Sequence, residues 1–309
     1  MDKFIKAIRQ AHSKDEYLKI CRKFKSKLDQ EIPASVSSDY NQTLLHCAAT
    51  VDNAELAEAL IEAGANIEAK DREGLTPIYR AVSNSSIKVL RCLLKAGAIT
   101  TAPKNYSYSP LHRAVKYSFA KGVKLLIAAG ADVRARAADG EEPIHYINAG
   151  HSINIHELLC ADAAMDVLGA KQRNSEPSLV TIRKRAYKCL QLLLENGADI
   201  NALDQFGSNA VQIKIYSCDP HITKKLIESG VSVNHPNHKG KTALHILLGG
   251  SLSTTDTRNL KVLLENGANP NLKDQDGKTP LNLLEHNPKI PTKWRRRLVK
   301  IIKSDKILS

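Results

Sequence analysis

A glycine recurs at a nearly fixed spacing along this chain of 309 residues, each time at the end of an apolar run and directly before an alanine or valine. Successive members of the series are 33, 33, 67, 33 and 37 residues apart. The interval of 67 is close to two periods, and Leu159–Ala164 is similar to the other runs, with Ala163 in the place of the glycine. A period near 33 residues indicates stacked units that share their cores with their neighbours. The glycines are Gly64, Gly97, Gly130, Gly197, Gly230 and Gly267.

A second mark lies about 20 residues before these glycines and predicts the start of a helix. Residues 76–81 read Thr-Pro-Ile-Tyr-Arg-Ala, and residues 109–114 read Ser-Pro-Leu-His-Arg-Ala. Thr or Ser can cap a helix with its side-chain oxygen, and proline suits the first helical position. The later glycine can adopt the left-handed conformation that ends a second helix. Each period therefore predicts two short helices. Variants of the same phrase begin at Thr43, Glu142 and Thr242.

Two helices and a projecting hairpin loop in each period resemble the ankyrin repeat, whose family phrase is Thr-Pro-Leu-His-x-Ala. The resemblance covers residues 38–303 and implies an all-α solenoid of stacked helix-turn-helix units with projecting β-hairpin loops. We expect capping helices before the repeats and a short tail after them. The expected segments are a cap at 1–37, eight repeats, the fifth degenerate, at 38–70, 71–103, 104–136, 137–170, 171–203, 204–236, 237–273 and 274–303, and a tail at 304–309.

The net charge of +13 is concentrated at the two ends of the chain. Residues 1–37 contain nine Lys and Arg against five Asp and Glu, and residues 288–309 contain eight against one. The repeats between them are nearly neutral, unlike a surface that follows a phosphate backbone. We therefore do not expect nucleic acid to be the partner of the repeats.

Cysteine usage and hydropathy indicate the cellular location. Six cysteines are scattered without paired spacing, which is typical of a reducing compartment. The apolar runs are too short for a transmembrane span or a secretory leader. We expect a monomer in the cytoplasm or nucleus, or, if the source is a pathogen or symbiont, a protein delivered into the host cell.

No motif in the sequence predicts catalysis. Residues 240–242 and 277–279 both read Gly-Lys-Thr but lack the earlier glycine of a phosphate-binding loop. His151, His156 and Cys160 have spacings at which a zinc site is conceivable, but no second pair accompanies them. We expect a protein that is not an enzyme, with no cofactor and no metal.

The resemblance implies that a partner contacts the hairpin tips and the exposed face of each first helix. Aromatic residues are scarce in this chain, and several fall at such positions. Aromatic and arginine side chains dominate interface energies, so we expect a hot spot at Tyr106, Tyr108 and Tyr117. Alternatively, two of these tyrosines fill the space left because Ser107 replaces the turn glycine. The expected contact residues are Tyr40, Arg72, Tyr106, Tyr108, Lys116, Tyr117, Arg136, Arg183, Lys184, Phe206, Tyr216, Lys239 and Lys241.

The expected function is a scaffold that binds a partner protein through the concave ankyrin surface, as a regulatory adaptor or a host-directed effector. The alternative is a binder of nucleic acid or anionic membrane through the basic terminal helices. Residues 293–303 have an apolar face that begins with Trp294 and a basic face opposite. This segment is either the closing helix of the stack, a nuclear import signal, or a weak contact for an acidic surface.

Overall fold

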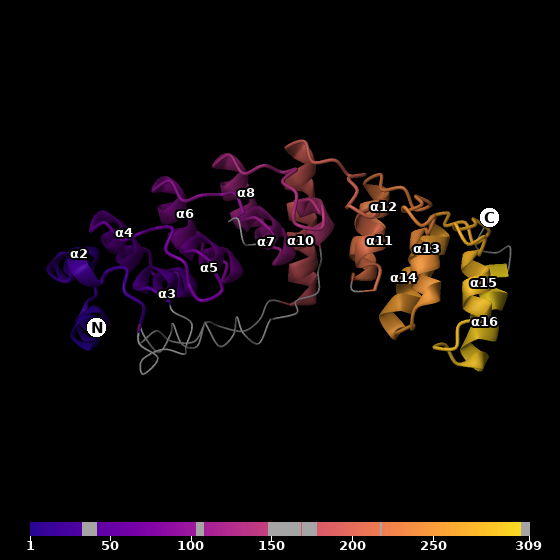
Figure 1. Ribbon diagram of the computed structural model, residues 1–309, viewed down its shortest axis with the longest axis horizontal. Coiled ribbons are helices and arrows are strands. Elements are labelled where there is room, and N and C mark those ends of the chain that lie inside the picture. The colour runs from indigo at the N-terminus through magenta and orange to yellow at the C-terminus, as the bar shows by residue number, and fades with distance from the viewer. Residues whose placement is uncertain (33–41, 103–107, 148–167, 169–177, 217, 304–309) are drawn as a thin grey trace. The chain divides into compact units, whose positions relative to one another are not determined.

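The structure is a computed structural model that describes residues 1–32, 42–102, 108–147, 168, 178–216 and 218–303 (Figure 1). These residues fall into two compact bodies: the N-terminal body, residues 1–132, and the C-terminal body, residues 133–147 with 178–303. All regular secondary structure in the described residues is helical, which confirms the expected fold class. Tight turns connect successive helix pairs. No helix among the described residues is long and apolar enough to cross a membrane.

The N-terminal body begins with two terminal helices and continues as helix pairs (Figure 1). Helices α3, α5 and α7 pack in one row, and α2, α4, α6 and α8 pack in a second row beside it. The terminal helix α2 packs on α4, at the start of the second row. The elements are α1 (Asp2–Gln10), α2 (Lys14–Lys23), η1 (Lys25–Lys27), α3 (Leu44–Val51), α4 (Ala54–Glu62), α5 (Pro77–Ser83), α6 (Ile87–Lys95), α7 (Pro110–Lys116) and α8 (Ala120–Ala128).

The C-terminal body has the same two-row arrangement. The row of first helices runs from η2 through α11 and α13 to α15, and the row of second helices runs from α10 through α12 to α14. The last helix, α16, packs on α15. The elements are η2 (Pro143–Tyr146), α10 (Leu179–Glu195), α11 (Ala210–Lys214), α12 (Pro220–Glu228), α13 (Ala243–Gly249), α14 (Thr254–Glu265), α15 (Pro280–Glu285) and α16 (Thr292–Lys303).

Several first helices are joined to the following repeat by a side chain at the fourth place of the repeat phrase. In α3, the backbone N–H of Thr43 donates to Nδ1 of His46 at 3.2 Å, and Nε2 of His46 lies 3.0 Å from the carbonyl oxygen of Leu75 in the next repeat. His245 repeats both bonds, with the Lys278 carbonyl as its distant acceptor. The ring accepts at Nδ1 and donates at Nε2, so it must be the neutral Nε2–H tautomer.

One repeat makes the same connection without a histidine. In α11, Gln212 stands at this place: its Oε1 accepts from the Asn209 backbone N–H at 2.9 Å, and its Nε2 donates to the Lys241 carbonyl at 2.7 Å. An amide has one acceptor and one donor end, so it reproduces the hydrogen bonds of a neutral histidine. In this repeat, the pair of bonds is thus made without an ionisable ring.

The turns between repeats are held by an acidic or amide side chain at their first position. Oδ1 of Asp71 accepts from the N–H groups of Glu73 and Leu75 at 3.0 and 2.9 Å, and its Oδ2 accepts from the buried Arg80 guanidinium. Asp204 and Asp274 bond the backbone of their own turns in the same way. Hydrogen bonds of this kind fix the turn before any partner arrives.

The expected repeats at 137–170 and 171–203 include residues 148–167 and 169–177, which lie outside the described residues. The N–H of Gln205 donates to the Asp139 carbonyl at 3.0 Å, as the N–H of His238 donates to the carbonyl of Phe206 in the next pair of turns. His145 of η2 likewise bonds the Ala202 carbonyl at 2.8 Å. The turn at 137–141 therefore stacks directly on the turn at 204–208. Between these turns, the described residues supply one helix pair, η2 and α10.

The buried histidines make the stability of both bodies depend on pH. Burial lowers the pKa of His46 to about 4 and also lowers the pKa values of His145 and His245 below their ordinary value of 6.5. Between pH 6.5 and 4, the unfolded chain binds a proton at His46 that the folded chain does not, so the free energy of unfolding falls as the pH falls. For His46 we expect a loss of about 3 kcal/mol by pH 4. Urea denaturation across this pH range measures it.

The control for this prediction is His46→Gln, which copies Gln212. The variant should fold and should lose part of the pH dependence, because the amide keeps both hydrogen bonds and does not titrate. A pH dependence identical to that of the wild type would contradict the assignment.

Candidate interaction surface

The expected contact residues at α7 form a small aromatic cluster. Nζ of Lys116 lies 5.8 Å from the ring centroid of Tyr108 and 5.9 Å from that of Tyr117. Both rings are half-buried, whereas Lys116 is exposed. An ammonium within about 6 Å of a ring is attracted by the ring quadrupole, so Lys116 favours this arrangement of the two rings. Two of the three expected tyrosines are thus neighbours; the third, Tyr106, and also Tyr40 lie outside the described residues.

Two buried residues that sequence reasoning did not select support this cluster. The guanidinium of Arg113 lies 5.8 Å from the Tyr117 ring and 5.9 Å from the ring of Tyr79 in the preceding repeat. The Tyr79 hydroxyl donates to the Tyr108 carbonyl at 2.9 Å. In the sequence, Arg113 and Tyr79 lie at repeat positions that predict buried residues. Their contacts with the tyrosine cluster could therefore be found only in the structure. Together they hold the cluster on a rigid base.

Two of the expected arginines make contacts within the C-terminal body. Nη2 of Arg136 donates to the Leu203 carbonyl at 2.7 Å, which ties the segment before the turn at 137–141 to the segment before the turn at 204–208. Nη2 of Arg183 lies 2.7 Å from Oδ2 of Asp219, the residue that caps α12. Arg183 and Lys184 both lie on α10. This helix continues without a break to Glu195, two residues before Gly197, where the second helix of a repeat is expected to end. The expectation that they lie on a first helix is therefore wrong.

The remaining expected residues lie at turns and helix ends. Phe206, at a turn, has 59% of its side-chain surface exposed. Tyr216 is exposed but donates its hydroxyl to the Ile246 carbonyl in the next repeat, and burial of part of the ring raises its pKa. Arg72, Lys184 and Lys239 are exposed, and Lys241 is half-buried.

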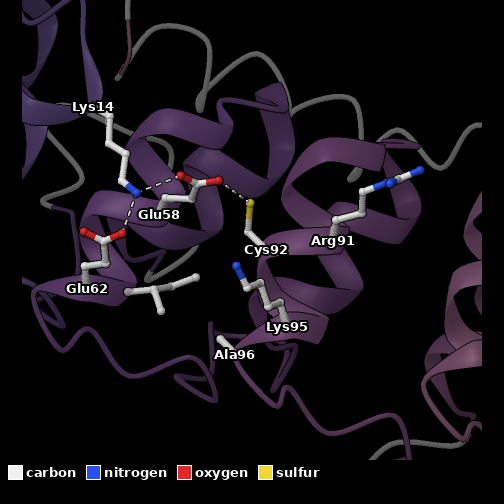
Figure 2. A pocket seen from close by; sticks show the side chains of 8 residues that line it. Lys14, Glu58, Glu62, Arg91, Cys92, Lys95 and Ala96 are labelled. Atoms are coloured by element: carbon white, nitrogen blue, oxygen red, sulfur yellow. Dashed lines mark hydrogen bonds and ion pairs between the residues drawn. The ribbon is translucent and has the colours of Figure 1, made fainter.

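A hollow of about 350 Å³ lies on the second-helix row of the N-terminal body, away from the expected contact residues (Figure 2). Figure 2 shows the Lys14 ammonium between the carboxylates of Glu58 and Glu62, at 3.0 and 2.5 Å. Sγ of Cys92 donates to Glu58 at 3.6 Å. The ion pair with Lys14 lowers the pKa of Glu58, so this carboxylate is charged and neutralised in place. Because Lys14 lies on α2 and Cys92 lies on α6, the Glu58 carboxylate links these two helices to α4.

The thiols of the described residues are not activated for nucleophilic chemistry. Burial raises the pKa of Cys21 and Cys92 to about 11 and that of Cys189 and Cys218 to about 12. A nucleophilic cysteine needs a lowered pKa, because the thiolate is the reactive form. Cys21, Cys189 and Cys218 therefore pack as small apolar groups, and Cys92 remains a protonated thiol that donates to Glu58.

The described residues contain no group of three or more His, Cys, Asp or Glu side chains placed to hold a metal ion. His235, a candidate ligand by residue type, instead places Nε2 at 2.9 Å from the Gly207 carbonyl. The trio His151, His156 and Cys160 lies outside the described residues.

The comparison with known families decides the classification. The family model for ankyrin repeats, which covers three copies, matches residues 10–103, 45–137, 111–204 and 179–253. The chain belongs to the ankyrin repeat family. Ankyrin repeats are in general modules of protein–protein interaction, which places the aromatic cluster and the turns on a fold whose surface serves recognition.

Similar proteins agree with this classification. The chain is 20% identical to the human ASB11 ankyrin repeat domain, with a TM-score of 0.59 over 84% of this chain and 98% of that one. It is 22% identical to the ankyrin repeat domain of Bcl-3, a unique member of the IkappaB protein family, with a TM-score of 0.57 over 85% and 99%. At these identities the likeness shows the fold alone.

A viral relative matches a shorter stretch. Over 64 residues, the chain is 36% identical to putative ankyrin repeat protein L91 of Acanthamoeba polyphaga mimivirus. This stretch is 20% of the chain and 10% of the viral protein.

Arg183 and Lys184 give a matched test of which charges are structural. Arg183→Ala removes an ion pair that is three-quarters buried and leaves the cap of α12 without its cation, so we expect the free energy of unfolding to fall by about 1–2 kcal/mol. Lys184→Ala removes an exposed charge and should change the free energy of unfolding by less than about 0.5 kcal/mol. Equal effects in urea denaturation would contradict the structural role of Arg183.

Proposed function

We propose that this ankyrin repeat chain is a binding protein without catalytic activity that captures a partner protein on the surface of its turns and first helices. The observation that carries the proposal is the arrangement of Tyr108 and Tyr117 around Lys116. Tyrosine rings supply large apolar area with few rotatable bonds, and interface hot spots are enriched in them. In the N-terminal body, these two rings are the anchors.

The rigidity of the cluster supports this role. Arg113 is buried beneath Tyr117, and its Nε donates to Oγ of Ser83 in the preceding repeat at 2.5 Å. Ordering a loose side chain on binding costs free energy that a preorganised side chain does not lose. The rings are thus presented in one arrangement before a partner arrives, which is the mechanism that the fold offers for tight binding.

In the C-terminal body, Phe206 is the corresponding anchor. Its N–H donates to Oδ1 of Asp204 at 2.8 Å, and its carbonyl accepts from the N–H of His238 at 2.9 Å. The backbone is fixed on both sides while the ring stays exposed. An exposed phenylalanine on a fixed turn is suited to a pocket on a partner protein.

The location and cellular role are further parts of the proposal. Five cysteines of the described residues are free thiols, and free buried thiols support an intracellular, reducing environment. A regulatory adaptor in the cytoplasm or nucleus fits this environment, and so does an effector delivered into a host cell. The viral relative favours neither strongly, because it matches only a short stretch.

The test is a pair of double variants at the tyrosine cluster. Partners are isolated from source cells on the immobilised wild-type chain, identified by mass spectrometry and titrated as purified proteins. Tyr108→Ala with Tyr117→Ala should raise Kd at least about tenfold, because each buried aromatic anchor contributes on the order of 2 kcal/mol. Tyr108→Phe with Tyr117→Phe keeps both rings and should stay within about threefold of the wild type.

Circular dichroism and the thermal midpoint check that both variants stay folded. A folded alanine double variant that binds its partner as tightly as the wild type would contradict the proposal. It would favour the alternative in which Tyr106 and Tyr108 fill the space left because Ser107 replaces the turn glycine.

A further inference from the structure

A second surface, separate from the tyrosine cluster, lies at the last helices of the C-terminal body. Side chains of α14 and α16 border two adjoining hollows of about 200 and 410 Å³. Trp294 and Leu298 line both hollows, so the two form one continuous depression, which we call the Trp294 groove. The apolar and neutral groups of its wall are Leu252, Thr257, Leu260, Leu264, Ile290, Pro291, Trp294 and Leu298.

Trp294 stays exposed although its helix is packed. Leu298 and Ile302 are buried under the same helix, but 52% of Trp294 is exposed. The orientation of α16 is fixed at its start, because the Trp294 N–H donates to the Pro291 carbonyl at 2.9 Å and Nη1 of Arg295 donates to the Glu285 carbonyl at 3.0 Å. The indole is therefore held over the groove by the helix and does not reach the core. The sequence places Trp294 on the face of Leu298, and the packing leaves it uncovered.

The rim of the groove is basic. Lys289 lines one hollow, and Lys261 and Arg297 line the other. Residues 288–303 contain seven Lys and Arg and no Asp or Glu. The one carboxylate of the rim, Glu265, lies 3.5 Å from Lys261 and offsets only that charge. The field at this surface therefore attracts an anionic ligand.

The shape of the groove decides among anionic ligands. A bilayer or a phosphate backbone contacts the basic charges of a helix but does not fill hollows of this volume, whereas a large apolar side chain does. Interface hot spots are enriched in tryptophan, and apolar grooves bind the apolar face of amphipathic helices. The wall follows the 12 residues of α14, a length of about 18 Å, which matches about three turns of a bound helix.

We propose that the Trp294 groove binds an acidic peptide segment that carries aromatic or large aliphatic side chains on one face. The apolar side chains fill the two hollows against Trp294 and Leu298. The carboxylates meet Lys289 and Arg297. This surface is independent of the tyrosine cluster and gives the chain a second binding site.

The probes are three synthetic 12-residue peptides with capped ends. The first has Glu at the outward positions and Leu and Phe at i, i+3, i+4 and i+7; the second has Lys in place of Glu; the third has Ala in place of Leu and Phe. Trp294 is the single tryptophan of the chain, so its fluorescence reports on the groove alone. We expect the first peptide to shift the emission to the blue in the full chain, with the other two at least tenfold weaker.

Two charge variants on the same helix separate the groove from general attraction. Arg297 lines the groove and Arg296 does not, although both are exposed. Arg297→Glu should weaken the first peptide at least fivefold more than Arg296→Glu does. Trp294→Ala, followed by fluorescence anisotropy of a labelled peptide, should weaken it at least tenfold. The alanine double variant at Tyr108 and Tyr117 should bind it as the wild type does, which keeps this test separate from that of the proposed function.

Several outcomes would overturn the proposal. They are an alanine-faced peptide that binds as tightly as the first, equal effects of the two arginine variants, or no binding of the first peptide. Tighter binding of vesicles of phosphatidylcholine and phosphatidylserine, or of a short DNA duplex, with the same shift of the Trp294 emission, would assign the surface to membrane or nucleic acid instead.

Discussion

The hydrogen bond from the fourth residue of the repeat phrase to a carbonyl of the following repeat is the interaction on which the rest of the structure depends. His46, His145 and His245 make it with Nε2, and Gln212 makes it with its amide. The same side chains accept from the backbone at the start of their own helices, so one group both caps a helix and binds the next unit. A helix of five to eight residues is not stable alone in water, and this double role holds it in place.

The side chains proposed for binding are not the ones that donate this hydrogen bond. Tyr108 and Tyr117 lie around the exposed Lys116 above a buried arginine, and Phe206 lies on a turn whose backbone is bonded on both sides. Recognition and stability thus involve different side chains on the same backbone. Substitution of an anchor should change the affinity for a partner with little effect on the free energy of unfolding. Substitution of a fourth-place residue of the repeat phrase should lower the free energy of unfolding with little direct effect on affinity.

The sequence predicted the helix pairs because each carries its own local signals, a cap at the start and a left-handed glycine at the end. Local signals did not distinguish one helix from two at α10, where Ile182, Ala186 and Cys189 continue one apolar face. The pairing of the Asp139 and Gln205 turns, which defines that repeat, joins residues far apart in the chain. Likewise, the helical spacing predicted that Trp294 and Leu298 share one face of α16. It could not predict that Leu298 is buried while Trp294 stays exposed, because this depends on the packing of neighbouring helices.

Hydrogen exchange in the full chain with His46→Ala tests the central claim most directly. The substitution removes the bond to Leu75, so the account predicts that amides of α3 and α5 lose protection together, although the changed residue belongs to α3 alone. Loss of protection confined to α3, with α5 unchanged, would show that neighbouring repeats do not depend on this bond and would contradict the account.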